Sequence, residues 1–346
     1  MHARPSSIRS RRDLLIAGAA LCAAPVQAVA RVGAPAPVVH SVTGPLAPQD
    51  LGLTLAHEHL FSIFGAEPTD APEYDQARVL ATVGPYLRYL RALGCRTVVD
   101  ATAMRFGRQP QLLRALSRAS GLQILTNTGA YGAADDRYVP DAVRTASAES
   151  IAARWIAEAG DGIDGTGIRP GFIKIGVDAG PLSALDRRLV EAGALTHRAT
   201  GLTIAVHTGD NPVAARAQLD VLHAQGVDPS AWIWIHASAS SDDQSLWDVA
   251  GRGGWLGLDG LRAETYDRHL ALVLDGCRRG LGHRLLLSHD GNSWPMPGRL
   301  PRPYDLLLTT FRRRLVSEGL SEATVQALLI DNPRAAFAGG VRLRAA

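Results

Sequence analysis

The chain has 346 residues, of which 46% are hydrophobic and 20% charged, and it carries a formal net charge of +3. This length and composition allow a large buried core, arranged as one large α/β domain or two smaller ones. Residues 1–30 hold four arginines and one aspartate, so the net charge of the remaining chain is close to zero. The charge therefore argues against a nucleic-acid or anionic-membrane partner.

The N-terminus carries the features of an export signal. Arg11 and Arg12 precede a short apolar run, rich in alanine and glycine, that reaches Ala20. This pattern resembles a twin-arginine signal peptide, and the run is too short to span a bilayer. We expect the twin-arginine machinery to export the folded protein to the bacterial periplasm or the medium, without stable membrane insertion. An uncleaved basic tail is the alternative.

Small residues near the end of this segment indicate where the signal is cleaved. Cleavage after Ala28 or after Ala30 fits the small-residue pattern of a signal-peptidase site. We therefore predict a signal peptide over residues 1–30 and a single domain over residues 31–346.

Short apolar runs alternate with longer segments of helical periodicity along the rest of the chain, which is the pattern of repeated βα units. Segments 109–120 and 182–200 are two of the predicted amphipathic helices. Eight such units over roughly 250 residues predict a (β/α)8 barrel, the TIM barrel. A doubly wound open sheet is the alternative, but no Gly-rich phosphate-binding motif follows any run. The predicted strands cover residues 53–59, 97–101, 124–129, 172–177, 203–208, 232–237, 255–260 and 285–290.

Three further segments flank the predicted barrel. Residues 38–46 have the pattern of a small N-terminal β-hairpin that covers the base of the barrel, and residues 293–303 predict a long loop after the eighth strand. Residues 320–337 predict a C-terminal helix. Cys95 and Cys277 have no spacing typical of a metal site, and the spacing leaves open whether they pair.

Polar side chains occur at the ends of nearly all the predicted strands, where a buried strand does not require them. In a barrel these carboxyl ends converge on one face, where barrel enzymes place their chemistry. Four histidines, one lysine and one aspartate converging there predict a metal site, and imidazole with carboxylate suits Zn²⁺ or a related divalent ion. The strand-end residues are His57, His59, Asp100, Lys174, His207, His236, Asp259 and Asp290.

A structural role is the alternative for each of these residues. A lone histidine in an apolar run is more often a hydrogen-bonded core residue than a ligand, but four at strand ends argue against this interpretation. Asp100 and Asp259 are assigned structural roles, in which they cap the next helix or orient a ligand histidine. Glu58 is expected to point away from the barrel mouth, and His289 to pack behind the sheet.

Lys174 is the only lysine of the chain, and it lies between Ile173 and Ile175 in a predicted buried strand. Beside two metal ions, a buried ammonium group would be desolvated and repelled, which lowers its pKa towards that of a neutral amine. A neutral amine can react with CO₂ to form a carbamate whose two oxygens bridge two metal ions, and arginine cannot do this. The alternative is a lysine that extends to solvent, but this does not explain why arginine is absent here.

With these residues in place, the chain resembles the phosphotriesterase family of the amidohydrolase superfamily, in its lactonase and aryldialkylphosphatase group. The resemblance covers residues 40–337. It rests on six motifs in the order of the family, namely V-T-G-P-L with L-T-L-A-H-E-H-L, G-I-R-P-G-F-I-K-I-G, A-V-H-T-G, I-H-A-S, G-L-D and L-L-S-H-D.

The resemblance implies a centre of two divalent ions, with zinc expected and cobalt, manganese or iron as alternatives. A hydroxide that bridges the ions would attack the substrate, and Asp290 would act as both ligand and base. The family also suggests a homodimer. The implied ligands are His57, His59 and Asp290 for one ion, His207 and His236 for the other, and N6-carboxylysine at Lys174 between them.

The family resemblance does not identify the substrate, so we take its indicators from the residues of the loops. Tyr131 stands in a T-G-x-Y sequence similar to that of the lactonase branch, where the tyrosine lines the pocket. A tyrosine that packs the loop is the alternative. Arg262 is expected to substitute for the His or Arg that relatives often have after the seventh strand. The last loop is shorter than in the organophosphate hydrolases of the family, and its Trp294 is expected to form part of a small apolar cover over the mouth.

One departure concerns the proton relay. Relatives usually have an acidic residue within a few positions of the sixth-strand histidine, but His236 is followed by small residues and Asp242 comes late. We expect hydrolysis of a small lactone or carboxyl ester, with weak phosphotriesterase activity. The alternatives are a dedicated organophosphate triester hydrolase, an amide hydrolase and a metal-containing binding protein without turnover.

Overall fold

The computed structural model describes residues 37–294 and 298–344. The expected signal peptide lies outside the described residues. Among the described helices, none combines the length and the hydropathy that are needed to cross a bilayer.

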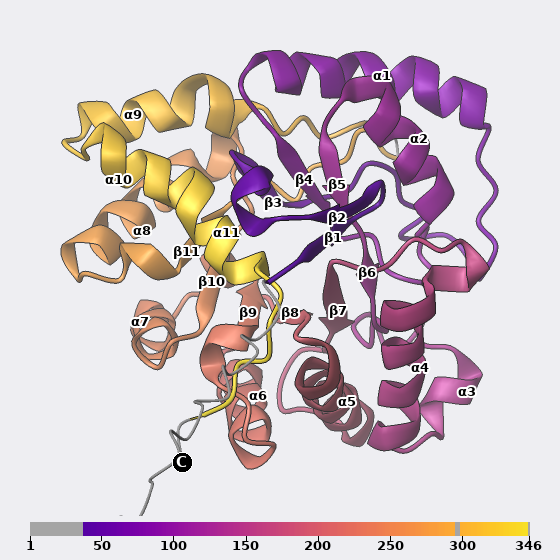
Figure 1. Ribbon diagram of the computed structural model, residues 1–346. Helices are drawn as coiled ribbons and strands as arrows, with labels where there is room; N and C mark the ends of the chain where they lie inside the picture. Colours follow the sequence, from indigo (N-terminus) through magenta and orange to yellow (C-terminus); the bar gives the residue numbers. More distant parts are fainter. Residues whose placement is uncertain (1–36, 295–297, 345–346) are drawn as a thin grey trace, which may run out of the picture. The chain divides into compact units, whose positions relative to one another are not determined.

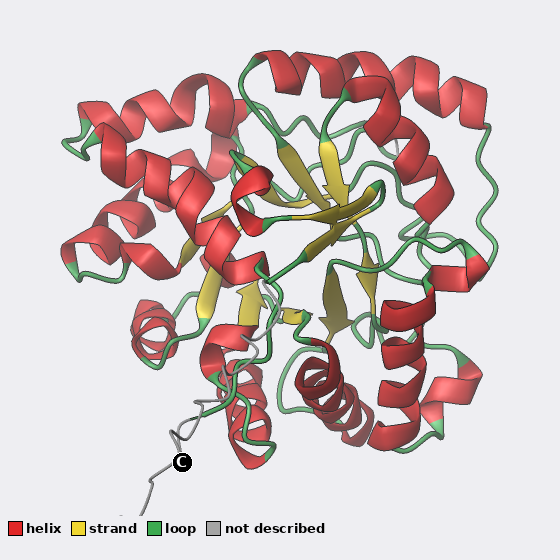
Figure 2. Cartoon of the chain, viewed as in Figure 1, coloured by secondary structure: helices red, strands yellow, loops and turns green. Residues whose placement is uncertain are grey.

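Eight parallel strands form the predicted TIM barrel, surrounded by helices (Figures 1 and 2). The ring closes between the first and last strands, where His59 pairs with Asn292 and His57 O accepts a hydrogen bond from Asp290 N at 3.2 Å. The third strand differs from its prediction because it is interrupted at Thr126, which divides it into β5 and β6. The barrel strands are β3 (Thr54–Glu58), β4 (Thr97–Asp100), β5 (Gln123–Leu125), β6 (Asn127–Thr128), β7 (Phe172–Gly176), β8 (Thr203–His207), β9 (Trp232–Ile235), β10 (Trp255–Leu258) and β11 (Leu285–Leu287).

The helices begin and end at recognisable capping residues. Helix α5 starts with a capping box, in which Ser183 Oγ accepts from Asp186 N and Asp186 Oδ2 accepts from Ser183 N, and it ends at Gly201 with φ +75°. The α-helices are α1 (Gln76–Ala92), α2 (Pro110–Ser120), α3 (Asp141–Arg144), α4 (Ala148–Asp161), α5 (Ala184–Thr200), α6 (Pro212–Ala224), α7 (Asp243–Gly251), α8 (Tyr266–Arg278), α9 (Arg312–Ser317), α10 (Glu322–Gln326) and α11 (Asn332–Phe337).

Short 3₁₀ and π turns connect these elements. The predicted helix over 320–337 is present, but a π turn, η8, separates α10 from α11. Pro333 at the start of α11 has no amide hydrogen for an i→i−4 bond, so the regular α ladder cannot continue through this point. The turns are η1 (Pro48–Leu51), η2 (Ile163–Gly165), η3 (Pro229–Ala231), η4 (Ala237–Ala239), η5 (Ala263–Thr265), η6 (Gly282–Arg284), η7 (Leu307–Phe311) and η8 (Ala327–Asp331).

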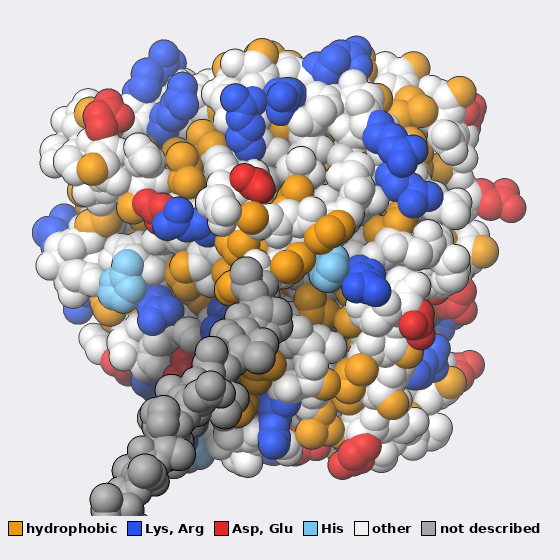
Figure 3. Space-filling model, viewed as in Figure 1, with side chains coloured by type: hydrophobic (Ala, Val, Ile, Leu, Met, Phe, Trp, Pro, Cys, Tyr) orange, Lys and Arg blue, Asp and Glu red, His pale blue; other side chains and the backbone are white. Residues whose placement is uncertain are grey.

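The base of the barrel is closed by the predicted hairpin and by the C-terminal helix. Strands β1 (Val39–Ser41) and β2 (Gly44–Leu46) pair antiparallel. Val39 and Phe337 are buried with side chains from the barrel interior, and the ring centroids of Phe337 and Phe172 are 5.7 Å apart. Figure 3, which shows the hairpin side, has positive, negative and apolar side chains interspersed. This closure leaves the opposite end, where the strands terminate, open for a site.

The segment after β11 is a loop, as predicted. Asn292 and Arg302 exchange two backbone hydrogen bonds of 2.8 Å across it. Cys95 is buried and Cys277 partly buried, and both are free thiols rather than a disulfide.

Candidate metal centre

The six predicted ligands converge at the carboxyl ends of the strands. His57 lies in β3, Lys174 in β7 and His207 at the end of β8. His59 and His236 directly follow β3 and β9, and Asp290 lies three residues after the end of β11. All six line one cavity of about 150 Å³. The lining ligands are His57, His59, Lys174, His207, His236 and Asp290.

His57, His59 and Asp290 form one half of the site. Asp290 Oδ1 lies 3.5 Å from His57 Nε2 and 3.2 Å from His59 Nε2. His57 Nε2 is buried and has no hydrogen-bond partner among the described residues. Ligand atoms of the three residues lie within 4.8 Å of one another. A buried imidazole nitrogen without a partner, facing a carboxylate, fits a divalent cation better than an empty space.

His207 and His236 form the other half. Their ring centroids are 4.7 Å apart, and His236 is 5.0 Å from His57 by the same measure. Lys174 pairs with Ala205 in the β7–β8 register, two positions below the pair of Gly176 and His207. The lysine therefore reaches up from a deeper layer of the barrel towards the histidines.

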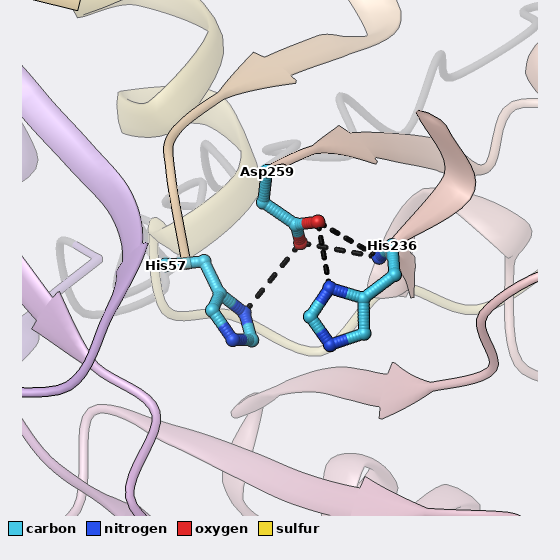
Figure 4. A group of neighbouring side chains, drawn as sticks. All are labelled: His57, His236 and Asp259. Atoms are coloured by element: carbon cyan, nitrogen blue, oxygen red, sulfur yellow. Dashed lines mark hydrogen bonds and ion pairs between the residues drawn. The ribbon is translucent and has the colours of Figure 1, made fainter. Parts of the chain in front are cut away.

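Asp259 orients the ligand histidine His236 and forms a longer ion-pair contact with His57 (Figure 4). Its Oδ1 is 2.8 Å from His236 Nδ1, its Oδ2 is 3.6 Å from His57 Nδ1, and both oxygens accept from His236 N. Burial opposes ionisation of the Asp259 carboxyl group, yet His236 and His57 lower its pKa. Because Asp259 bonds Nδ1 of His236, the Nε2 atom of that ring is left for a metal. Asp259 therefore has the orienting role expected for it.

Thr102 orients His59 in the same way. Thr102 Oγ1 donates to Phe61 O at 3.0 Å, so it accepts from His59 Nδ1 at 2.8 Å. The proton is thereby fixed on Nδ1, and the Nε2 lone pair faces the cavity. Asp100 accepts from Leu60 N and Thr102 N at 2.8 and 3.0 Å, which ties the ends of β3 and β4 together.

Burial favours the neutral form, which metals need, at two of the four histidines and at the lysine. It lowers the pKa of His57 to about 3 and that of His207 well below its usual value, so both rings are neutral at pH 7. Burial also lowers the pKa of Lys174 to about 8. Since metal ligands must be deprotonated, these shifts favour ion binding.

Glu58 is a functional residue that the sequence analysis did not identify. It points away from the mouth, as expected, but there it holds the chain around Asp290. Its Oε1 accepts from Ser288 Oγ at 2.7 Å and from His289 Nδ1 at 2.8 Å, and its Oε2 accepts from Gly291 N at 2.7 Å. The only available signal was a carboxylate at the end of a buried strand.

The backbone at Asp290 is strained, which explains the need for this support. Asp290 has φ +54° and His236 has φ +62°. The left-handed region costs a residue with a side chain about 1–3 kcal/mol. Both ligands thus depend on surrounding hydrogen bonds, from Glu58 and Asp259 respectively, to hold a conformation that aims them into the cavity.

Of the three residues predicted to bind the substrate, one lines the cavity and two do not. Tyr131 lines the cavity, with its ring centroid 5.2 Å from that of His207. Arg262 does not line it, because its side chain is 62% exposed and pairs with Glu264. Trp294 packs against the hydrophobic core under the guanidinium group of Arg78, so it does not cover the mouth.

Other residues complete the cavity where the sequence analysis expected apolar cover. They come from the segments that follow the strands, which vary in length and shape and have no periodic pattern. The additional lining residues are Ser62, Phe64, Phe106, Arg299 and Arg302. Asp242 is not among them, because it caps helix α7 by accepting from Ser245 N. The missing acidic neighbour of His236 is therefore not replaced by Asp242.

Comparison with known proteins agrees with this geometry. The Phosphotriesterase family model matches residues 37–337. A phosphotriesterase homology protein of Escherichia coli is 30% identical, with 83% of this chain and 98% of that protein covered. N-acetyltaurine hydrolase of Rattus norvegicus is 27% identical, covering 86% of this chain and 96% of that protein. The structure of a mutant Deinococcus radiodurans PTE-like lactonase superposes with a TM-score of 0.78 at 29% identity, covering 86% and 99%.

The fold, the convergent histidines and the length of the family match lead to one conclusion. The chain belongs to the phosphotriesterase family, whose members are hydrolases that depend on two metal ions.

Proposed function

We propose that this protein hydrolyses a small lactone or carboxyl ester with two divalent ions bound in the cavity. The observation that carries the proposal is the set of imidazole nitrogens aimed at one carboxylate, with His57 Nε2 buried and without a partner. His57, His59 and Asp290 would hold one ion, and His207 and His236 the other. When bound, such ions acidify water and polarise a carbonyl oxygen.

Lys174 would complete the centre as a carbamate. The amine is 1% exposed and its pKa is lowered by burial, so the neutral form that reacts with CO₂ is accessible near neutral pH. The neutral amine forms an N–C bond with CO₂ and releases one proton. Counted from the ammonium form, two protons leave in all, and a cation becomes an anion with two oxygens. This change removes a positive charge from among the imidazoles and adds two ligand atoms that can reach both ions.

Asp290 would be the base. It accepts the proton that water loses on attacking the carbonyl carbon, and it returns this proton to the oxygen that leaves when the C–O bond breaks. Glu58 would act as a positioning residue, because its bonds on both sides of Asp290 fix the direction of that carboxylate. Zinc is the first choice of metal, because imidazole and carboxylate ligands suit it.

We place lactones first among the substrates because of the size of the cavity and the residues that line it. Its volume of about 150 Å³ suits a small substrate, and Tyr131 forms part of its wall. The similarity to the Deinococcus radiodurans lactonase supports the same choice. The runner-up is phosphotriester hydrolysis. Amide hydrolysis is a further candidate, since a relative is named N-acetyltaurine hydrolase and the same attack applies to a C–N bond.

We also propose that the protein is exported after folding. This proposal rests on the paired arginines Arg11 and Arg12 near the N-terminus. Transport of a folded chain would allow metal and carbamate to be acquired in the cytoplasm.

Replacing Lys174 tests the carbamate. We expect Lys174→Ala to lose nearly all activity and bound metal, and to recover part of both when acetate or propionate fills the space with a carboxylate. Lys174→Met should not recover, because its side chain occupies that space. Carbon-13 NMR of wild-type enzyme prepared with labelled bicarbonate should show a carbamate signal. An active, metal-containing wild type without this signal would contradict the carbamate.

Changing Glu58 to glutamine tests the support of Asp290. We expect metal affinity to fall about 10- to 100-fold, as for other groups that orient metal ligands, and kcat to fall with it. Competition with a chelator measures the affinity, and circular dichroism reports whether the variant is folded. Glu73→Gln, at an exposed position, is the control. Unchanged affinity and kcat in folded Glu58→Gln would remove Glu58 from this role.

A substrate panel tests the reaction. Metal-containing enzyme should have a kcat/KM for small lactones or carboxyl esters at least an order of magnitude above that for paraoxon-type triesters, because the cavity is small. A reversed ratio would favour the phosphotriesterase alternative. Tight ligand binding with no turnover of any ester, lactone, amide or phosphoester would favour a binding protein.

Substitution of both Arg11 and Arg12 by lysine tests export. We expect active precursor to accumulate in the cytoplasm, because the twin-arginine pathway reads that pair. Cell fractionation with an activity assay measures it, and undiminished export of the double variant would refute the route.

A further inference from the structure

The cavity has two chemically different sides. One is an aromatic wall formed by Phe64, Phe106 and Tyr131, with ring centroids 4.9 Å apart for Phe106–Tyr131 and 5.7 Å apart for Phe64–Phe106. These residues are carried by the segments after β3, β4 and β6. Aromatic faces at edge-to-face angles make a rigid apolar surface. This wall fits the hydrocarbon part of a small molecule.

The other side carries Arg299 and Arg302, both from the segment after β11. Arg302 is held in place, because its backbone exchanges two hydrogen bonds of 2.8 Å with Asn292, two residues after Asp290. Its guanidinium nitrogen lies 3.3 Å from Asp290 Oδ2. The exposed Arg299 forms no ion pair with any residue in 37–294 or 298–344. The position of Arg302 is thus set by the same turn that presents Asp290.

This side of the cavity has two arginines, Arg299 and Arg302, but only one carboxylate near them, that of Asp290. Asp290 is the only carboxylate among the described lining residues. The proposed centre commits it to an ion, so the arginines would then have no protein counter-ion in the cavity. Guanidinium groups bind oxyanions such as carboxylate with paired hydrogen bonds. An anion on the substrate would supply the missing charge.

We infer that the substrate carries an oxyanion, such as a carboxylate, that pairs with Arg302 and Arg299 while its hydrocarbon part packs against the aromatic wall. The inference rests on the proposed hydrolytic function and specifies its substrate class. Because Arg302 contacts Asp290, the anion lies only a few bonds from the carbonyl that is attacked. Arg302, which contacts Asp290, is the main specificity residue, and Arg299, which forms no ion pair with a described residue, contributes less.

A matched pair of substrates tests the inference. One is a γ-butyrolactone with a carboxylate on the carbon next to the ring oxygen, and the other is its carboxamide, which has nearly the same shape and no charge. Metal-containing wild type should prefer the carboxylate in kcat/KM, mainly through KM, and the preference should decline with added salt. In Arg302→Gln the carboxylate-to-carboxamide ratio should fall about 10-fold or more. Arg299→Gln should lower it less.

The carboxylate-to-carboxamide ratio distinguishes a direct contact between Arg302 and the substrate from an effect of Arg302 on Asp290. If Arg302 acted only through Asp290, its loss would slow both lactones equally and leave the ratio unchanged, which would overturn the inference. Arg154→Gln, an exposed arginine on α4, is the control and should keep the wild-type ratio. A wild type that prefers the carboxamide would also overturn the inference. Metal content is measured for every variant.

Binding measurements distinguish this inference from the proposed function. If neither lactone is hydrolysed, the proposed lactone hydrolysis fails, and calorimetry of both compounds with the metal-containing protein still tests the anion site. Tighter binding of the carboxylate, lost in Arg302→Gln, would support the site. Equal binding of the two compounds, or a preference that survives in Arg302→Gln, would contradict it.

Discussion

The buried amine of Lys174 is the constraint on which the rest of the site depends. It is almost inaccessible to solvent and points at a group of imidazoles. Burial desolvates an ammonium group in that place, and the lowered pKa of Lys174 expresses this cost. Burial also lowers the pKa values of His57 and His207. Asp290 is the one carboxylate that lines the described cavity, so two divalent ions would leave an excess of positive charge, which the carbamate would reduce.

The layer around these donors determines what they can do. Asp259 and Thr102 accept hydrogen bonds from Nδ1 of His236 and His59, respectively, so the Nε2 atoms of both rings face the cavity. Glu58 holds the turn at Asp290, whose backbone would otherwise relax from its left-handed conformation. Each supporting group is buried and bonded to backbone as well as to side chain. The strain at the ligands is thus balanced by hydrogen bonds to strands that the barrel already fixes.

The sequence predicted the parts of the site that the strands carry. Position along a strand fixes which way a side chain points, so His57 and His59 could be placed in the mouth from alternation alone. Glu58 was placed on the opposite side by the same rule, but its partners in the segment after β11 could not be known, because pairing across the closed barrel is a long-range property. The break at Thr126 and the π turn before Pro333 were also missed. The second has a local signal, because Pro333 lacks the amide hydrogen that a regular α-helix needs.

Predictions for residues in the loops were less accurate than those for the strands. The contrast reflects the different functions of strands and loops. Trp294 and Arg262 were expected in the cavity, but one packs on the core and the other extends to solvent. Arg302 was not expected there, and only the backbone pairing with Asn292 brings it back to Asp290. A barrel of this kind therefore keeps its metal chemistry on the strands and its selectivity on the segments that follow them. If Arg302 pairs with the substrate as proposed, exchange of this one loop cation would change the charge that the mouth accepts while every residue of the ligand set stays the same.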